Sequence, residues 1–481
     1  MIEVRRFGSL EEAAFLRDEV NALNRASARP DPFSTFEFYE NYLRYDEYFP
    51  RGRGLRLWFL AAFSAGRLVG YMALKQTTQR VLGLRASKLD FLVTYDDDRP
   101  QLVARPEQAL AVSEAFYAYL LERKREWSFL EFRQQDAASP LFPPPAAVQL
   151  KGYLVRQWPS LDNGTIHVCW STLDAYFKSF SKKFRSNVSR QMRSLLAAGE
   201  VEYLASSDPA TTPALFELYR GIEPRSWKLR AGVAIGRHSQ WVEYFKGLLD
   251  ARQPMRVSVH VLLLDGAPIA GLINGEFMKG LYALHIVYDE SLSRLAPGSA
   301  MLLMGMRQAI DGRYAFFNLL SGFGYYKLRW QAQMTQTRIA QIYRVGSPMY
   351  WRRVLGDWKR RVFPARSKEM PALFNFTRRD VCERKGGHAE PGEIPRLRIS
   401  REERERIAAL IAEVRKGDGE FLSAVELAAA MPFPTQRDHA GAVSGCRAFR
   451  NESITVPMTL INSPTSMPTS APATPNRSIP Q

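Results

Sequence analysis

The chain has 481 residues with a formal net charge of +17, and 46% of its residues are hydrophobic. This length predicts two or three domains, and the composition supplies enough apolar residues for real cores. The charge favours anionic partners such as coenzyme phosphates, RNA or an anionic membrane surface, although a basic composition does not choose among them. Three widely spaced cysteines argue against a disulfide scaffold and indicate a reducing compartment.

We expect neither a transmembrane helix nor a signal peptide. No stretch reaches about 18 uncharged apolar residues, and the longest candidate, 57–66, is interrupted by Arg67. The first residues, MIEVRRFGSLEEAAF, place acidic side chains where a signal peptide needs an apolar segment. The expected location of this arginine-rich, bacterial-looking protein is therefore the cytoplasm.

Residues 1–158 predict the first of two α/β halves. Apolar runs on both sides of Ser64, Ala65 and Gly66 predict a β-hairpin with a tight turn. The expected elements are, in chain order, a helix over 10–24, an aromatic segment over 33–48, the hairpin over 55–75, a strand over 88–95, a helix over 106–127 and a strand over 129–133.

Residues 161–346 predict a second half with the same order of elements. Its hairpin turns at Asp265 and Gly266, a strong short-range turn signal. The sequence identity between the halves is weak, so the repeat is architectural. The expected elements are a helix over 173–198, a strand over 201–205, helices near 213–221 and 238–250, the hairpin over 256–277, a strand over 281–288, a helix over 299–311, and strands over 315–320 and 337–345.

Two zones follow the second half. Residues 348–366 predict a basic, aromatic helix, which is either a membrane-surface anchor or, as we favour, a helix packed against the second half with its arginines in water. Residues 367–481 predict a C-terminal extension that is largely disordered apart from one helical stretch over 400–414. Truncation after Arg366 is therefore expected to leave activity largely intact.

A tight turn precedes the helix over 299–311. Pro297 and Gly298 form the turn, and Ser299 can cap the helix that begins there. A helix N-terminus presents free backbone N–H groups and the positive end of the helix dipole, which suits a pyrophosphate. The alternative is a purely structural cap.

The run 321–330, SGFGYYKLRW, follows a strand with a buried pattern. Gly322 and Gly324 let the backbone turn sharply where the strand ends, and Tyr326 precedes Lys327. Ligands tend to bind at strand ends in open α/β sheets, and a lysine there can hold a phosphate or stabilise a developing oxyanion. The alternative is a solvated lysine on a surface helix.

The helix over 173–198 carries a cluster of basic residues that includes Arg185, Arg190 and Arg193. Arg190 and Arg193 share one face because they are three positions apart. A cationic face beside a site would gather phosphates, whereas the alternative is a solvated amphipathic helix.

Candidates for proton handling are Tyr288, Asp289 and Glu276, although an aspartate directly after a strand is more often a turn residue. His260 and His285 fall within predicted strands, so we interpret them as core residues. The sequence contains no HExxH, paired CxxC, P-loop or GxSxG motif, so we expect no metal cofactor, NTPase or α/β-hydrolase chemistry.

The order and spacing of these motifs resemble the FemAB-like branch of the GNAT superfamily, whose members are often described as CelD-like acetyltransferases. That branch combines an arginine helix, a hairpin, "YD…PG" before a helix, and a terminal "G…YK…W". The resemblance covers 161–345, and PFSTFEFYENY resembles the aromatic opening helix of the first half. The matching motifs here are, in order, the basic segment 181–193, Asp265-Gly266, Tyr288-Asp289, Pro297-Gly298, and Gly322 to Lys327 with Trp330.

The resemblance implies tandem GNAT-like domains, each a mixed central sheet flanked by helices, and transfer of an acyl group to an amine. It implies that Lys327, with Tyr326 beside it, contacts the reacting carbonyl or its nucleic-acid carrier. The arginine helix would bind donor or acceptor. The usual pyrophosphate sequence, Arg/Gln-x-x-Gly-x-Gly/Ala, is replaced by RLAPGSA. The residues expected to bind acyl-CoA there are Pro297, Gly298, Ser299 and Ala300.

The resulting site hypothesis assigns catalysis to Lys327, Tyr326, Asp289 and Tyr288, and substrate binding to the three arginines with Gly322 and Gly324. Three functions fit it. The first is N-acyl transfer from acyl-CoA to a small molecule, amino sugar or cell-envelope precursor. The second is FemAB-like aminoacyl transfer from tRNA, although no coiled-coil arm is visible. The third is a non-catalytic GNAT-like scaffold for exopolysaccharide assembly, with a peripheral contact at the inner membrane through 350–366.

Overall fold

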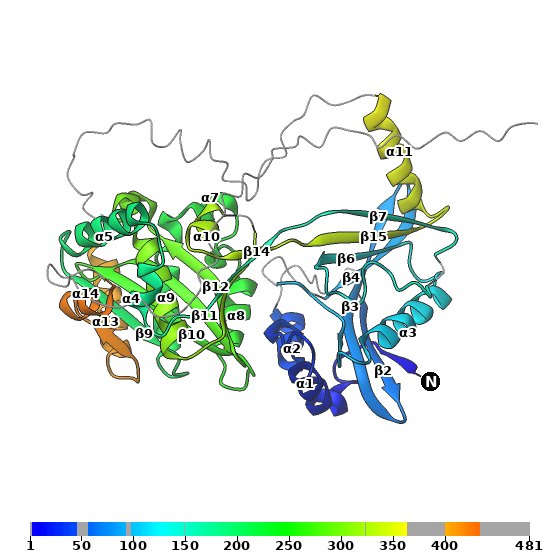
Figure 1. The fold of residues 1–481 in the computed structure, drawn as a ribbon, viewed down its shortest axis with the longest axis horizontal. Coiled ribbons are helices and arrows are strands. Elements are labelled where there is room, and N and C mark those ends of the chain that lie inside the picture. The colour runs from blue at the N-terminus through cyan, green and yellow to red at the C-terminus, as the bar shows by residue number, and fades with distance from the viewer. Residues whose placement is uncertain are drawn as a thin grey trace, which may run out of the picture. The chain divides into compact units, whose positions relative to one another are not determined.

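Two eight-stranded sheets organise the chain, and helices flank both of them (Figure 1). This arrangement confirms the predicted mixed α/β fold class. Every residue described below belongs to one compact unit, Met1–Asp438. The computed structural model describes residues 2–45, 56–92, 98–148, 150–322, 324–362 and 400–432.

The first sheet has the strand order β1-β2-β3-β4-β6-β15-β7, with β5 paired to β3. Alternate residues of β2 face opposite sides: Phe59 and Ala61 enter the core under α1 and α2, whereas Trp58 and Leu60 enter the core under α3. The elements are β1 (Glu3–Phe7), α1 (Arg17–Arg25), α2 (Phe36–Tyr45), β2 (Arg56–Ser64), β3 (Arg67–Val81), β4 (Leu84–Phe91), β5 (Val103–Ala104), α3 (Ala109–Glu122), β6 (Phe129–Gln135), β7 (Tyr153–Pro159) and β15 (Arg338–Arg344).

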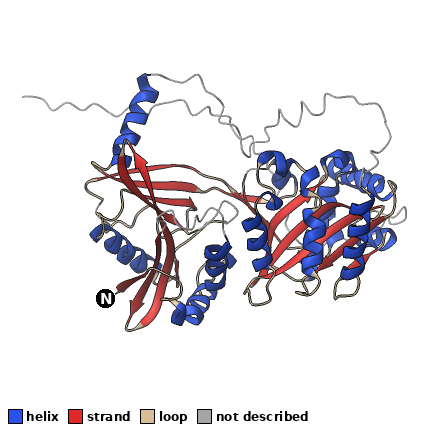
Figure 2. Cartoon of the chain, turned by 180° about the vertical axis from the view of Figure 1, so that it is seen from behind, coloured by secondary structure: helices blue, strands red, loops and turns tan. Residues whose placement is uncertain are grey.

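The second sheet has the order β14-β8-β13-β12-β11-β10-β9-β16, and helices cover both of its faces (Figure 2). Residues of α4, α5 and α9 share one core, and residues of α6, α8 and α13 share the other. The elements up to β11 are β8 (Asn163–His167), α4 (Leu173–Lys178), α5 (Lys182–Leu196), β9 (Val201–Ser206), α6 (Thr212–Arg220), α7 (Trp227–Ala231), α8 (Ser239–Leu248), β10 (Arg256–Leu264) and β11 (Ala267–Phe277). The remaining ones are β12 (Gly280–Tyr288), η5 (Glu290–Leu295), α9 (Pro297–Asp311), β13 (Phe316–Ser321), α10 (Tyr325–Arg329) and β14 (Gln333–Thr335).

The two sheets repeat one topology. Each contains one parallel pair among its mainly antiparallel strands, β4 with β6 and β12 with β13, and a helix connects the two strands of each pair. Each also contains the predicted hairpin, with two successive residues at positive φ in the turn. Those residues are Ala65 (49°) and Gly66 (76°) in the first half, and Asp265 (50°) and Gly266 (71°) in the second.

Strand β15 belongs to the first sheet, where it pairs with both β6 and β7. The sequence division at 158–161 places these residues in the second half instead. The strand fits the first sheet because Ala340 and Ile342 are fully buried on the same side, in the core under α3. The last strand of the chain's second half thus completes the first sheet.

Part of the C-terminal extension is folded. Helix α13 (Arg401–Val414) places Ile407, Ile411 and Val414 in the core with α6, because these residues share one helical face. Strand β16 (Glu420–Leu422) pairs with β9, and α14 (Ala424–Ala430) follows it. The expected helical stretch over 400–414 is therefore confirmed, whereas β16 and α14 show that 415–432 is also folded, which was not expected. The rest of that extension lies outside the described residues.

Helix α11 (Pro348–Val362) corresponds to the expected basic, aromatic helix. Its principal contacts are with β3, β4 and β15 of the first sheet, so the expected packing against the second half is wrong. Its inner residue Met349 packs with Phe129 and Tyr343. Among the described residues, no helix is long and apolar enough to cross a membrane.

Candidate active site

Strands β12 and β13 pair only at their first residues. Gly280–Tyr282 align with 316–318 in parallel register. Beyond these positions, β12 continues to Tyr288 and β13 to Ser321, but the two strands no longer pair with each other. A bulge in β12 at Leu284 shifts its register against β11 on the other side. Beyond Tyr282, the backbone of β12 is thus not paired with β13.

Helix α9 begins at the end of β12, beside this divergence. Its N-cap is Ala296, in the left-handed conformation with φ of 53°, and no side chain caps the helix. Ser299 therefore lies inside the first turn, and the expectation that it caps α9 is wrong. A Cβ on Gly298 would lie 3.1 Å from the Tyr288 ring, so a glycine lets the turn pack closely on β12.

Lys327 is buried, with 3% of its surface exposed, which excludes a solvated lysine. Its Nζ donates to the carbonyl oxygens of Leu320 (2.8 Å) and Ser321 (3.2 Å), where β13 ends. Burial lowers the pKa of Lys327 to about 8, and the negative charge of Asp98 opposes that shift. Two of the three ammonium donors therefore hold the end of β13.

The backbone at this strand end is strained in a way that fits the lysine. Leu320 has φ of 59° and Gly322 has φ of 105°, both in the left-handed region. A Cβ on Gly164 of β8 would lie 2.8 Å from Cδ of Lys327, so only glycine leaves room for the lysine side chain. Gly324 is the N-cap of α10, the short helix that carries Tyr326 and Lys327.

A buried polar network joins this strand end to the first half. Asp98 Oδ2 accepts hydrogen bonds of 2.8 Å from the side-chain amides of Asn163 and Asn318. Ser321 Oγ lies 2.8 Å from Asp98 Oδ1 and 2.9 Å from Gln134 Oε1. Asp98, Asn163 and Asn318 are each at most 4% exposed. The carboxylate of Asp98 thus fixes both β8 and the end of β13.

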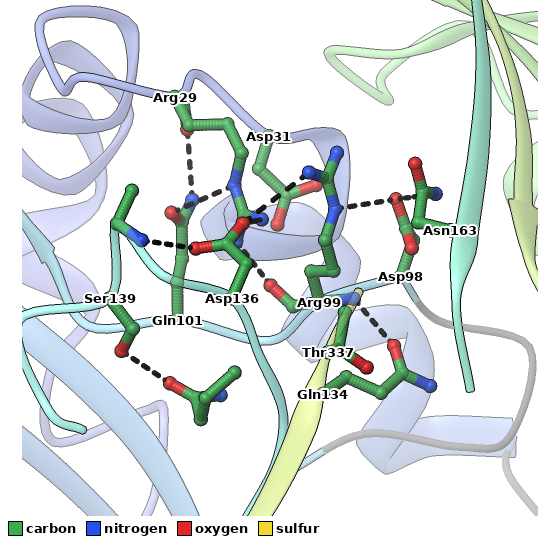
Figure 3. A network of polar contacts seen from close by, with 12 residues as sticks. Arg29, Asp31, Asp98, Arg99, Gln101, Gln134, Asp136, Ser139, Asn163 and Thr337 are labelled. Atoms are coloured by element: carbon green, nitrogen blue, oxygen red, sulfur yellow. Dashed lines mark hydrogen bonds and ion pairs between the residues drawn. The ribbon is translucent and has the colours of Figure 1, made fainter. Parts of the chain in front are cut away.

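Arginines of the first half extend the network around Asp98 (Figure 3). Arg99 lies between Asp98 (3.3 Å) and Asp136 (3.5 Å), and Arg29 lies 3.4 Å from Asp136. Burial raises the pKa of the nearby Asp31 to about 6. Both arginines already bind carboxylates. This outer part of the network is therefore structural and holds loops of the first half together.

Of the proton-handling candidates, Asp289 and Glu276 are engaged elsewhere. Asp289 accepts hydrogen bonds from Arg225 Nε (2.6 Å) and from the backbone of Ser291 (2.9 Å), so it caps η5. Glu276 accepts from Gln308 and from Tyr314 near the C-terminal end of α9, roughly 20 Å along the helix from its start. It lines a separate cavity of about 420 Å³.

The arginine helix lies close to the start of α9, since α5 contacts both η5 and α9. Arg190 and Arg193 are exposed, whereas Arg185 donates to the carbonyl of Lys178 (3.3 Å). Trp330 packs on Phe184 of α5 and so connects α10 to the arginine helix. The fold therefore brings α5, α9, α10 and the ends of β12 and β13 into one region, while Tyr326 is 40% exposed there.

Both histidines lie in strand cores, as predicted. His260 contacts Tyr203 (2.6 Å) and Ser258 (2.9 Å), and burial lowers its pKa to about 4. His285 contacts Tyr219 (2.6 Å), and burial together with the charge of Lys228 lowers its pKa well below the ordinary value. Both rings are therefore neutral at neutral pH and serve as hydrogen-bonded core residues.

The sequence reasoning missed the network of Asp98, Asn163 and Asn318. One signal was available, because Asn318 interrupts the apolar strand FFNLLS, and a buried amide needs hydrogen-bond partners. Its partners lie more than 150 positions away along the chain, so no local pattern identifies them.

Residues 182–328 match the family model of the acetyltransferase (GNAT) domain, which is less than half of the chain. A search of curated proteins finds no match. Solved structures with a similar fold include FemX (12% identity, 73% of this chain and 99% of that chain, TM-score 0.48) and a tandem GNAT protein from the clavulanic acid biosynthesis pathway (13%, 72% and 99%, TM-score 0.41). Another is Saccharomyces cerevisiae N-myristoyltransferase with bound myristoyl-CoA (12%, 71% and 82%, TM-score 0.35). These are distant likenesses, and the GNAT assignment rests on the family model.

Proposed function

We propose that the protein is an N-acyltransferase that moves an acyl group, in the first instance acetyl, from acyl-CoA to a primary amine. The observation that carries this proposal is the divergence of β12 from β13 inside the segment that matches the acetyltransferase model. An acyl-CoA arm contains amide groups that can pair with the free edge of β12, and the thioester would then lie between the two strands.

The start of α9 is the proposed phosphate site. Gly298 offers a backbone N–H next to Pro297, which has none, and no side chain caps this end. The N–H groups of Ser299 and Ala300 in the same turn donate to the carbonyl of Ala296 (2.9 and 3.4 Å), so we propose that these two residues border the phosphate site. Arg190 and Arg193 on the neighbouring α5 add exposed positive charge. We assign coenzyme binding to the start of α9, and binding of donor or acceptor to the arginine helix with Arg185.

The proposed chemistry centres on Lys327. Its ammonium keeps the end of β13 turned away from β12, and its remaining donor would stabilise the oxyanion that forms when an amine attacks the thioester. Tyr326 and Tyr288 are the hydroxyl groups proposed to assist proton transfer. Asp289 is proposed to position the loop before α9 instead, because its carboxylate already binds Arg225 and Ser291.

The acceptor we propose is the amine of a small molecule, an amino sugar or a cell-envelope precursor, and the closer assignment is to the FemAB-like or CelD-like acetyltransferases. Isothermal titration with coenzyme A, together with acetyl transfer to a panel of amines, tests this. Micromolar coenzyme binding and turnover are expected. Binding of charged tRNA without coenzyme A would instead indicate an aminoacyltransferase. A folded protein that binds neither and turns nothing over would indicate a scaffold for polysaccharide assembly. We propose a cytoplasmic location.

A further inference from the structure

Helix α11 carries an apolar stripe on its outer face. The stripe consists of Trp351, Leu355, Trp358 and Val362, which are 50%, 48%, 57% and 49% exposed. These positions follow the spacing i, i+4, i+7 and i+11, so they form one continuous face of the helix. A surface helix ordinarily turns such a face toward a core, and an exposed one marks an interaction site.

The opposite face of α11 is fixed to the first sheet. Met349 is 8% exposed within a small core, and Ser347, directly before the helix, donates to the carbonyl of Ser128 (3.2 Å). The guanidinium of Arg353 lies 4.4 Å from the centre of the Trp158 ring. Turning the stripe inward would break these contacts, so the fold holds the stripe on the surface.

Positive charge borders the stripe. The helix sequence PMYWRRVLGDWKRRV contains five basic residues and one acidic residue, Asp357, which pairs with Arg353 (3.0 Å) on the inner side. Arg352 and Lys359 are exposed and seven positions apart, so both lie along the same border of the stripe. The outer face therefore combines aromatic and aliphatic groups with exposed cations.

We propose that this stripe docks on a membrane surface that carries anionic headgroups. Tryptophan and leucine side chains partition into the boundary between headgroups and acyl chains, while arginine and lysine attract the anionic lipids. A second copy of the chain fits less well, because a twofold contact through the stripe would bring two sets of like charges together. This inference is independent of the proposed acyl transfer.

Flotation of the full-length protein with lipid vesicles tests the proposal. The probes are vesicles of phosphatidylcholine with about 30% phosphatidylglycerol, and vesicles of phosphatidylcholine alone. We expect binding to the anionic vesicles that is at least about tenfold tighter than to the neutral ones and that weakens as salt is added. The double variant Trp351→Ser, Trp358→Ser should lose roughly tenfold in binding.

The matched control is Phe15→Ser, which removes an aromatic side chain that is 68% exposed on another surface. It should bind the anionic vesicles like the wild type, and thermal unfolding should confirm that all variants fold. Three results would overturn the proposal: no flotation of the wild type, equal flotation of the double variant, or a stripe-dependent dimer in sedimentation velocity without any vesicle binding.

Discussion

The two halves of the molecule share a plan but end their parallel strand pairs differently. In each half, the strand that leaves the pair has an antiparallel partner on its other side, β15 beside β6 and β8 beside β13. In the second half, β13 leaves the pair and is followed by α10, whose Lys327 turns inward to hold the strand end. The two strand ends meet where Ser321 contacts Gln134.

Under the proposed function, the first half supports the site and the second half binds the ligand. Both parallel pairs join three positions, and both leaving strands carry left-handed backbone near their end, at Gln134 in β6 and at Leu320 in β13. The buried Lys327 that binds the end of β13 distinguishes the second half. The first half has no such lysine at the end of β6, but it contributes Asp98 to the second half's strand end. The first half therefore acts on the candidate site as a rigid polar support.

The largest expected effect comes from removing the C-terminal elements that belong only to the second half. A chain ending at residue 399 loses α13 and β16, and with them the burial of Ile407, Ile411 and Val414. Three such side chains contribute on the order of 5 kcal/mol to the free energy of unfolding. Urea unfolding measures the loss, which replaces the expectation that truncation after Arg366 is harmless.

A chain ending at residue 432 is the matched control, because it keeps every C-terminal element that the structure describes. It should unfold at the same urea concentration as the full chain. If the chain ending at residue 399 were as stable as the full chain, the packing of α13 on α6 would contribute nothing to the free energy of unfolding. The C-terminal elements would then no longer distinguish the second half from the first.

The next largest effect is expected at Lys327, which follows β13, and it is compared with a substitution of Lys151, which follows β6. Lys327→Ala should lower kcat/KM for acyl transfer by about 10- to 1000-fold, because it removes an oxyanion donor and releases the end of β13. Lys151→Ala changes an exposed lysine in the corresponding part of the first half and should leave the rate unchanged. Near wild-type activity of the folded Lys327 variant would refute the proposed role.

The sequence predicted what local patterns control. Both hairpin turns, the repeated order of elements and helix α9 follow from turn residues and periodicity within short segments. The sequence did not predict that β15 belongs to the first sheet. Apolar strand residues such as Ile342 fit either sheet, and only the three-dimensional pairing decides between them. The folded 400–432 segment was underestimated because its burial depends on α6, far away along the chain.

The candidate site was predictable only in part. The sequence identified Lys327 and the turn before α9, but not that Lys327 is buried against its own strand or that Asp289 is committed to Arg225. Those facts depend on which side chain fills which space, as at Gly164 beside Lys327. Asp98 could not be identified because its partners come from the other half.

The smallest expected effect tests most directly whether Asp98 of the first half acts on Lys327. Asp98→Asn keeps the shape of the side chain but removes the negative charge that raises the pKa of Lys327, so that pKa should fall below its value of about 8. If the ammonium form is the active one, activity is present below this pKa and is lost as pH rises through it. The variant should therefore lose activity at lower pH than the wild type, with a roughly three- to tenfold lower rate near pH 8.

Asp136→Asn is the control for this test, since the Asp136 carboxylate belongs to the same network but contacts Arg29, Arg99 and the backbone N–H of Ala138, and not Lys327. Its pH profile should match the wild type. NMR titration of labelled lysine would measure the pKa of Lys327 without relying on turnover. An unchanged lysine pKa in Asp98→Asn would show that the first half holds the strand end by hydrogen bonding alone and does not act on the site through charge.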